Sequence, residues 1–327
     1  MNATRPVGVV LTEDGAGRPP QLTDLDERME WRFTDAAGLP DALRGAQVLM
    51  LWDFFSTALR DAWPHCDALQ WIHVTAAGVD SLLFDELRAS EVVITNARGT
   101  FDRPIAEFVL ASVLAHAKRL HESWDLQRER TWRHRETLRV QGRRALVVGT
   151  GAIGREIAGL LRAAGLQVQL AGRSARADDD FGQTVASADL IVDGHFGAAD
   201  YVINAAPLTD QTRDLFDAEA FAAMGSGAHF INIGRGPSVV EEDLAAALHS
   251  GALDGASLDV FRSEPLPAEH PLWHAPGAVI SAHMSGDVVG WREVLAEQFT
   301  DNLRRWLDAG ELVNVVDKEL GFVSSTP

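Results

Sequence analysis

The stretch Val147–Leu161, VVGTGAIGREIAGLL, decides the fold of this chain. An apolar run that ends at Val148 is typical of a buried strand, and the sequence after the glycines has the spacing of a helix. Gly149, Gly151 and Gly154 lie between these two elements. In this context the first glycine permits a tight turn, the second lets backbone approach a pyrophosphate, and the third lets helix pack on strand. The stretch therefore predicts a dinucleotide-binding turn, with a purely structural turn as the alternative.

The end of the next expected strand bears on which nicotinamide cofactor is bound. An NAD enzyme usually carries Asp or Glu about 20 residues after the glycines, where it binds the ribose. Here Leu170–Arg176 reads LAGRSAR, and no carboxylate follows before Asp178. Arg173 and Ser174 instead supply donors that suit a 2′-phosphate, so the sequence predicts NADP(H), with NAD(H) kept as the second cofactor. The alternative is that these arginines are solvated surface residues.

Two series of short apolar runs, each followed by a helical or turn-forming segment, lie along the chain. This rhythm is typical of a parallel α/β sheet, and 327 residues are too many for one ordinary core, so we expect two domains. Helical spacing is expected at 104–119 and at Trp291–Leu307. The strand-like runs are Val7–Leu11, Val48–Trp52, Gln70–Val74, Val92–Thr95, Ala145–Val148, Val168–Ala171, Tyr201–Asn204, His229–Ile233, Ala256–Leu258 and Ala278–Ser281.

The bulk composition argues against several classes of partner. The net charge is -18, and an acidic surface repels both nucleic acid and an anionic membrane. No apolar run reaches the roughly 20 residues that span a bilayer. Cys66 is the only cysteine, which excludes an intramolecular disulfide and fits a reducing compartment. We therefore expect a cytoplasmic protein that binds neither nucleic acid nor membranes, and we predict no metal site.

Three residues downstream of the glycine turn have the chemistry of a reductase: Arg235 in IGRGP, Glu264 in FRSEP and His283 in SAHMSG. A guanidinium can bind the carboxylate of a 2-oxo acid, a carboxylate can orient an imidazole, and the imidazole can deliver a proton. The alternatives are a surface ion pair for Arg235, a turn role for Glu264 and a satisfied core position for His283.

Six motifs follow one another along most of the chain. They are HVTAAGVD at 73–80, PIAEFVLASVLA at 104–115, VVGTGAIGREIAGLL at 147–161, NAAPLTDQTRDLF at 204–216, INIGRGPSVVEEDL at 231–244 and LDVFRSEPLPAEHPLW at 258–273. From about Trp71 to Val316 the sequence resembles the D-2-hydroxyacid dehydrogenase family, especially its glyoxylate/hydroxypyruvate reductase branch. Several motifs in one order make the resemblance specific.

The resemblance implies two Rossmann-like, doubly wound parallel-sheet α/β domains with the active-site cleft between them. The substrate domain would consist of 1–117 and 288–327, and the dinucleotide-binding domain of 118–287. The implied reaction is hydride transfer between NADP(H) and a small 2-oxo or (R)-2-hydroxy acid, such as glyoxylate or hydroxypyruvate. Such enzymes typically form dimers, and Trp124 and Trp132 mark a candidate dimer arm, although both could pack within one subunit.

The resemblance also implies roles for individual residues. Arg235 would bind the substrate and stabilise its developing alkoxide, His283 would be the acid, and Glu264 would orient it. Asp259 would bind the nicotinamide carboxamide, with a cap or loop ion pair as the alternative. The turn that contains Ala77, Gly78 and Val79 would donate backbone N–H groups to the substrate carboxylate. The other implied cofactor-binding positions are Gly149, Gly151, Ala152, Ile153, Gly154, Arg173, Ser174, Ala206, Pro207, Thr212, Ile233 and Gly234.

The size of the substrate pocket is not decided by the sequence. Trp52, with Phe54 and Phe55, ends an early strand, where it could line the pocket or pack in the core. A large apolar pocket would favour bulky 2-oxo acids, and a filled one would favour glyoxylate. Ala282 stands where the family usually has a proline before the histidine, which loosens the loop but keeps the proton donor.

Two other functions are compatible with the fold. One is a non-enzymatic NAD(P)-binding sensor, as in the transcriptional corepressors that share it. The other is a formate- or phosphite-oxidising relative, although the formate branch commonly has Gln in the role of Glu264. The acidic surface and the retained carboxylate favour the reductase.

Overall fold

The structure, a computed structural model, describes residues 5–13 and 17–323. The chain divides into unit 1, Met1–Thr100 with Val289–Pro327, and unit 2, Phe101–Val288. The outer ends of the expected substrate domain, 1–4 and 324–327, lie outside the described residues. Each unit has its own sheet and its own apolar core.

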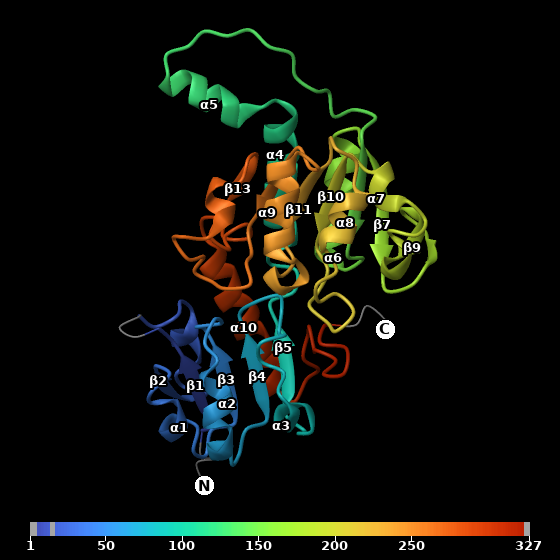
Figure 1. Ribbon diagram of the computed structural model, residues 1–327. Helices are drawn as coiled ribbons and strands as arrows, with labels where there is room; N and C mark the ends of the chain where they lie inside the picture. The colour runs from blue at the N-terminus through green and yellow to red at the C-terminus, as the bar shows by residue number, and fades with distance from the viewer. Residues whose placement is uncertain (1–4, 14–16, 324–327) are drawn as a thin grey trace. The chain divides into compact units, whose positions relative to one another are not determined.

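Unit 1 is built on a parallel five-stranded sheet in the order β2-β1-β3-β4-β5 (Figure 1). The apolar runs predict four of these strands. They do not predict β2, because this edge strand is only partly buried and its sequence EWRFT mixes charged and aromatic residues. The strands are β1 (Val7–Leu11), β2 (Glu30–Thr34), β3 (Val48–Leu51), β4 (Trp71–Val74) and β5 (Val93–Asn96).

Both faces of this sheet are covered, which explains why β3 reads VLML without a polar residue. Leu49 and Leu51 pack with the short helices α1, α2 and α3. Val48 and Met50 point to the opposite face and pack with α10. The helices are α1 (Leu39–Ala42), α2 (Ala58–Ala62), α3 (Asp85–Arg88) and α10 (Trp291–Leu307), the last with the bounds that its apolar spacing predicts.

Unit 2 contains an eight-stranded sheet in the order β13-β12-β11-β10-β6-β7-β9-β8. The chain runs from β6 to β7 on one side and later to β10 on the other, so the carboxyl end of β6 is a topological switch point, where doubly wound sheets bind ligands. Only β8 is antiparallel to its neighbour. The strands are β6 (Arg144–Val148), β7 (Gln167–Gly172), β8 (Arg176–Asp178), β9 (Gly182–Ala186), β10 (Tyr201–Asn204), β11 (His229–Asn232), β12 (Gly255–Leu258) and β13 (Ala278–Ile280).

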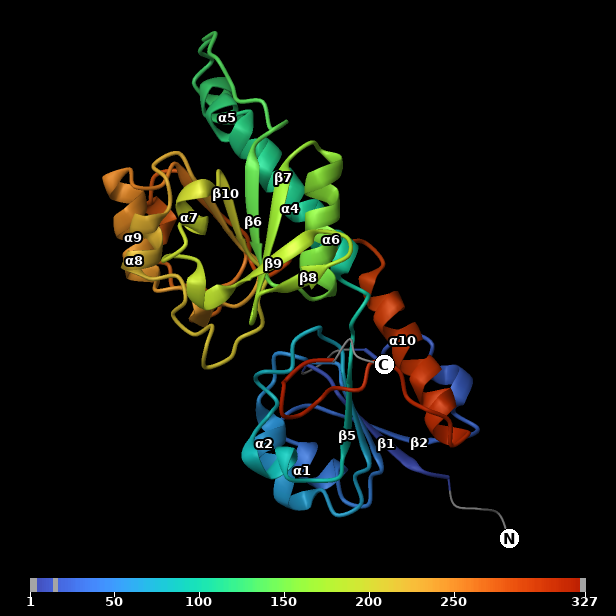
Figure 2. The same cartoon turned by 90° about the vertical axis from the view of Figure 1, so that its right-hand side faces the viewer.

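Helices cover both faces of the unit 2 sheet, with α4 and α6 on one side and α8 and α9 on the other (Figure 2). The expected boundary at residue 117 assigned the helix at 104–119 to the substrate domain, whereas α4 packs on α6 and belongs to unit 2. Apolar spacing shows that a helix is packed but not on which sheet. The helices are α4 (Asp102–Ala117), α6 (Ala152–Ala163), α7 (His195–Ala198), α8 (Ala218–Ala223) and α9 (Glu241–Ser250).

Beyond α4 the chain forms an arm, defined here as residues 120–141. It consists of α5 (Leu120–Arg128) and a returning segment without regular structure, and it projects from the body of unit 2 in both views (Figures 1 and 2). Within the part of the chain that the structure describes, no helix is both long enough and apolar enough to cross a membrane.

Each unit buries a histidine that the folded chain keeps neutral. Burial lowers the pKa of His73, on β4, to about 3. Burial, and then the neighbouring His116, lower the pKa of His229, on β11, well below its ordinary 6.5. Both side chains are at most 2% exposed. Because the unfolded chain protonates these rings near their ordinary pKa, protons bind more readily to the unfolded state.

We expect the free energy of unfolding to fall as the pH decreases below about 6.5, by up to about 1.4 kcal/mol per pH unit for each of these histidines. Above that pH both states are neutral and the rings contribute no pH dependence. Urea unfolding at several pH values should show a shallower acid slope for His73→Leu than for the wild type. Exposed His134 offers a control, His134→Leu, with the wild-type slope. An unchanged slope in His73→Leu would contradict the assignment.

Candidate functional site

Glu264 and His283 form a direct pair in unit 2. Oε2 of Glu264 lies 2.7 Å from Nδ1 of His283, and Oε1 accepts a hydrogen bond of 2.8 Å from the backbone N–H of Phe261. Burial raises the pKa of Glu264, but the hydrogen bonds from His283 and Phe261 outweigh burial, and its pKa lies below the ordinary value. Glu264 is therefore an ionised carboxylate that holds one nitrogen of the imidazole.

Arg235 lies near this pair. Its positive charge is a further cause of the lowered pKa of Glu264, and its Nη1 donates a hydrogen bond of 2.8 Å to the carbonyl of Gly234. The structure thus brings together a guanidinium, a carboxylate and an imidazole that are far apart in the sequence. All three residues belong to unit 2.

The loop that carries His283 is held by Asp259, the residue after β12. Its carboxylate accepts hydrogen bonds from the backbone N–H groups of Met284 (3.0 Å) and Ser285 (2.9 Å) and from the hydroxyl of Ser281 (2.5 Å). Its carbonyl accepts a bond of 2.8 Å from the N–H of His283. These contacts hold His283 at a φ of 49°, a left-handed conformation uncommon for residues other than glycine.

Asp259 is expected to bind the nicotinamide carboxamide. In the structure its side chain is 1% exposed, and both carboxylate oxygens accept hydrogen bonds from its own chain. The structure thus shows a residue that holds the loop of His283. Contact with the cofactor stays a prediction.

Two asparagines that are not among the predicted site residues hold the backbone of Arg235. Asn204 ends β10 and Asn232 ends β11, at neighbouring positions of the sheet. Nδ2 of Asn204 donates hydrogen bonds to Oδ1 of Asn232 (2.9 Å) and Oγ of Ser238 (2.7 Å), and the Ser238 hydroxyl donates one of 2.6 Å to the carbonyl of Arg235. The signal available in the sequence was a polar residue at the end of two apolar runs.

Gly236 lets the loop of Arg235 lie directly against the backbone that precedes Glu264. A Cβ at position 236 would lie 1.9 Å from the carbonyl carbon of Phe261 and 2.0 Å from its oxygen. No side-chain rotation relieves a clash with backbone, so any other residue here would push the two loops apart. The absence of a side chain at Gly236 is therefore a condition for Arg235 and Glu264 to share a site.

The three glycines of the turn after β6 have different surroundings. A Cβ at Gly149 would lie 2.5 Å from the carbonyl oxygen of Ala205, and a Cβ at Gly154 would lie 2.0 Å from that of Gly149. A Cβ at Gly151, the N-cap of α6, meets nothing within 4 Å. Gly149 and Gly154 are thus required by backbone contacts, whereas Gly151 leaves open space before the N–H groups that begin α6. This space and the positive end of the helix dipole fit a pyrophosphate.

Arg173 and Ser174 follow β7, close to the glycine turn. Gly172, the last residue of β7, lies so near that its Cβ would be 3.0 Å from the side chain of Thr150. Asp178, the first carboxylate after them, forms an ion pair with Arg155 of α6, and its side chain is only 2% exposed. This carboxylate is therefore engaged within the protein.

The other expected cofactor positions lie along the same edge, at the carboxyl ends of parallel strands. The Thr212 hydroxyl donates a hydrogen bond of 2.6 Å to the carbonyl of Pro207 and closes that turn. A Cβ at Gly234 would lie 2.9 Å from the carbonyl oxygen of Ala206, so the loops after β10 and β11 touch. The binding roles of these residues stay predictions. They are Ala152 and Ile153 at the start of α6, Ala206, Pro207 and Thr212 after β10, and Ile233 and Gly234 after β11.

In unit 1, the turn 77–79 follows β4. Nδ2 of Asn96 donates a hydrogen bond of 2.6 Å to the carbonyl of Ala77, and the side chain of Val79 is buried in the core. Gly78 lies between these two anchored residues. The turn is thus held on both sides, and its contact with a substrate stays a prediction.

The aromatic residues after β3 have three different environments. Trp52 packs against the core between the unit 1 sheet and α10. Phe54 packs against the core on the other face of that sheet. Phe54 also contacts Phe55 and Trp291, with ring centroids 4.5 and 6.1 Å away. Phe55 keeps 58% of its surface exposed. Core packing thus accounts for Trp52 at least in part, while its role in substrate binding stays a prediction.

The family model "D-isomer specific 2-hydroxyacid dehydrogenase, NAD binding domain" matches residues 110–285. Glyoxylate/hydroxypyruvate reductase A of Serratia proteamaculans is 31% identical over 264 residues, which cover 78% of this chain and 82% of the relative. (S)-Sulfolactate dehydrogenase of Chromohalobacter salexigens is 33% identical over 232 residues, which cover 70% and 75%. The chain therefore belongs to the D-isomer specific 2-hydroxyacid dehydrogenase family.

Solved structures lead to the same class. A family protein from Aeromonas salmonicida has a TM-score of 0.82 and 29% identity, with 96% of this chain and 100% of that chain covered. An NADPH-dependent glyoxylate/hydroxypyruvate reductase from Sinorhizobium meliloti, solved with NADP and sulfate, has a TM-score of 0.80 and 27% identity, with 97% and 100% covered. The predictions of Rossmann-like parallel-sheet domains and of an NAD(P)-dependent 2-hydroxyacid oxidoreductase are thus confirmed.

Among the described residues, no group of three or more His, Cys, Asp or Glu could hold a metal ion.

Gly236→Ala should separate the loops of Arg235 and Glu264. We expect kcat to fall about 100-fold, because a displacement of about 1 Å in a catalytic group has an effect of that size. Gly227→Ala is the matched control, since a Cβ there meets nothing within 4 Å. Both variants should be compared by thermal unfolding and by cofactor oxidation with a 2-oxo acid. Wild-type activity in Gly236→Ala would show that the contact does not hold the site together.

Proposed function

We propose that this protein reduces small 2-oxo acids, such as glyoxylate and hydroxypyruvate, to (R)-2-hydroxy acids with NADPH. The observation that carries the proposal is the pair of Glu264 and His283, 2.7 Å apart, with Arg235 nearby. The substrate class is supported by the relatives named as glyoxylate/hydroxypyruvate reductases. Neither a corepressor-like sensor nor a formate or phosphite dehydrogenase is favoured by these relatives.

Each residue of the cluster has one task in the proposed reaction. The planar guanidinium of Arg235 binds the carboxylate and carbonyl oxygen of the substrate and stabilises the negative charge that develops on that oxygen. His283 donates a proton from Nε2 to the same oxygen. Glu264 holds Nδ1, which fixes the ring plane and leaves Nε2 to face the substrate. The nicotinamide, when bound, supplies the hydride.

The preference for NADPH is supported by the end of β7. Arg173 and Ser174 offer a cation and a hydroxyl where an NAD enzyme carries a carboxylate. The nearest following carboxylate, Asp178, is taken up by Arg155. We place the reaction in the cytoplasm, a compartment that keeps a single thiol such as Cys66 reduced.

The central test is initial rates with NADPH and NADH against glyoxylate, hydroxypyruvate, pyruvate and phenylpyruvate. NADPH should give the higher kcat/KM. His283→Ala should lower kcat by at least about 100-fold, because general acid catalysis contributes that much, while NADPH still binds. Glu264→Gln keeps an acceptor for Nδ1 of His283 but removes the charge, so its rate should fall less than that of His283→Ala.

Exposed Glu269 provides a control for the loss of one carboxylate, Glu269→Gln, which should keep the wild-type rate. If His283→Ala turned over at the wild-type rate, the assigned acid would be wrong. If no 2-oxo acid were reduced and the protein instead captured a protein partner, the sensor would be the better explanation.

We also propose that the arm at 120–141 joins two copies of the chain in a homodimer. Trp132 is fully exposed and Trp124 of α5 is 53% exposed, so the arm presents large apolar side chains away from any core. The arm is nevertheless ordered, because Glu122 of α5 pairs with Arg133 at 2.7 Å and the N–H of Leu138 donates to the carbonyl of Ala117. An ordered element with exposed tryptophans is typical of an interface.

Replacing both tryptophans, Trp124→Ser with Trp132→Ser, should convert the dimer to a monomer, because aromatic anchors dominate the energy of such interfaces. Size-exclusion chromatography with light scattering measures the mass directly. Trp273, which is 45% exposed outside the arm, gives the control Trp273→Ser, expected to stay dimeric. A monomeric wild type, or a double variant that remains dimeric, would contradict the role of the arm.

A further inference from the structure

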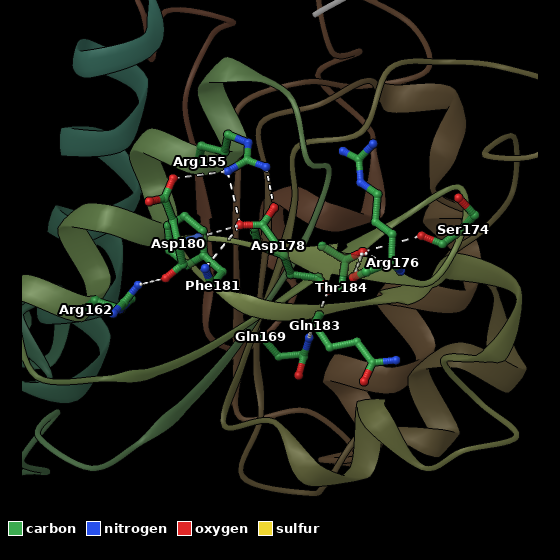
Figure 3. A network of polar contacts seen from close by, with 11 residues as sticks. Arg155, Arg162, Gln169, Ser174, Arg176, Asp178, Asp180, Phe181, Gln183 and Thr184 are labelled. Carbon is green, nitrogen blue, oxygen red and sulfur yellow. Dashed lines mark hydrogen bonds and ion pairs between the residues drawn. The ribbon is translucent and has the colours of Figure 1, made fainter. Parts of the chain in front are cut away.

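After β7 the chain forms the hairpin β8–β9 at the edge of the unit 2 sheet (Figure 3). The hairpin is attached to the end of β7, where Gly172 pairs with Ala186. Arg176 begins β8 opposite Thr184 of β9. Arg173 and Ser174 are thus part of a short loop with one end on β7 and the other on the hairpin.

Asp178 ends β8 and connects the hairpin to α6. Its carboxylate forms an ion pair with Arg155, and its Oδ1 also accepts hydrogen bonds of 3.1 Å from the backbone N–H groups of Asp180 and Phe181 (Figure 3). The hydrogen bond from Arg155 is the main cause that lowers the pKa of this carboxyl. With 2% of its side chain exposed, Asp178 is a buried, ionised anchor for the turn of the hairpin.

Further contacts fasten the same turn to α6. Arg162 donates a hydrogen bond of 2.6 Å to the carbonyl of Asp180, and its guanidinium lies 5.0 Å from the ring centroid of Phe181. The guanidinium of Arg155 lies 6.0 Å from the same ring. Because α6 begins at the glycine turn, the hairpin is held on the helix expected to receive the pyrophosphate.

Thr184 connects the hairpin to the loop itself. Thr184 is fully buried, and its hydroxyl accepts a hydrogen bond of 3.2 Å from the N–H of Arg176. The hydroxyl proton is shared between the carbonyls of Arg176 (3.2 Å) and Ser174 (3.4 Å). The contacts therefore form a continuous path from α6 through Asp178, the hairpin and Thr184 to Ser174. A change at Asp178 should reach the loop without altering the glycine turn.

We propose that Asp178 is a positioning residue for the 2′-phosphate of NADPH, because its pairing with Arg155 fixes the hairpin that holds Arg173 and Ser174 in place. The inference rests on the proposed function of those two residues. A bare carboxylate in this segment would repel a phosphate, but Arg155 neutralises Asp178, so its effect is geometric. If Asp178 acts by positioning the loop, removing its charge should weaken the binding of NADPH. If it acted by repelling the phosphate, removing its charge should strengthen that binding.

The deciding experiment measures KM for NADPH and for NADH in Asp178→Asn. We expect KM for NADPH to rise about tenfold, the size of a typical coupling between contacting charged groups, and KM for NADH to change less than about twofold. Asp180→Asn is the matched control: it removes the same charge, and its carboxylate lies 3.6 Å from Arg155 but is 76% exposed. This control should leave both values unchanged.

Hydrogen exchange gives an independent readout of the mechanism. The amides of 176–184 should exchange faster in Asp178→Asn and at the wild-type rate in Asp180→Asn. Arg155→Lys, which keeps the positive charge but not the planar donors, should produce part of both effects, and it serves as the test if Asp178→Asn does not fold. A lower KM for NADPH, an equal loss for both cofactors, or the same change in Asp180→Asn would each overturn the inference.

Arg173→Ala separates this inference from the function on which it rests. If Arg173→Ala weakens NADPH selectively but Asp178→Asn does not, the 2′-phosphate site stands and the positioning role fails. If Arg173→Ala affects neither cofactor, the assignment of the phosphate site fails, and the positioning role fails with it. Selective loss of NADPH in both variants, with exchange faster only around the hairpin, supports both.

Discussion

The contact between Gly236 and the carbonyl group of Phe261 is the constraint on which the candidate site depends. The two loops follow adjacent parallel strands, β11 and β12, and a side chain at 236 would collide with backbone at 1.9 Å. Because backbone cannot rotate away, only glycine allows Arg235 and Glu264 to approach each other. The positions of both functional groups therefore follow from the absence of a single Cβ atom.

Around this contact, buried polar groups give the loops one geometry. Asn204 and Asn232 hold the loop of Arg235, and Asp259 holds the loop of His283. Such groups are costly to bury unless they are hydrogen-bonded, and once bonded they allow few alternative arrangements. The side chains of Glu264 and His283 are partly exposed, whereas Asn204, Asn232 and Asp259, which hold the loops of the site, are buried. This division is expected of a site that must be organised before its substrate arrives.

The charges that bear on the candidate site act over short distances and not through the overall field of the protein. A protein with a net charge of -18 is unsuited to attracting anions through its overall field. Individual cations and helix ends lie instead at the positions predicted to receive an anion: Arg235 near the ionised Glu264, and the N-terminus of α6 behind Gly151. Arg155 has a different task, because it neutralises the buried Asp178. Pairing of acidic side chains is thus as important to the expected cofactor site as the cations themselves.

The sequence alone determined the class of the protein and most of its parallel strands, and it singled out Arg235, Glu264 and His283, whose catalytic roles stay predictions. These features are encoded locally, in apolar runs, in glycine spacing and in motifs that keep their order. Only the tertiary structure decided that α4 packs in unit 2, that β8 and β9 form a hairpin, that Asp178 pairs with Arg155, and that Asp259 holds the histidine loop. The physical reason is that the type of a polar side chain does not specify which residue it will contact. The order of the strands, which brings distant segments together, selects that partner.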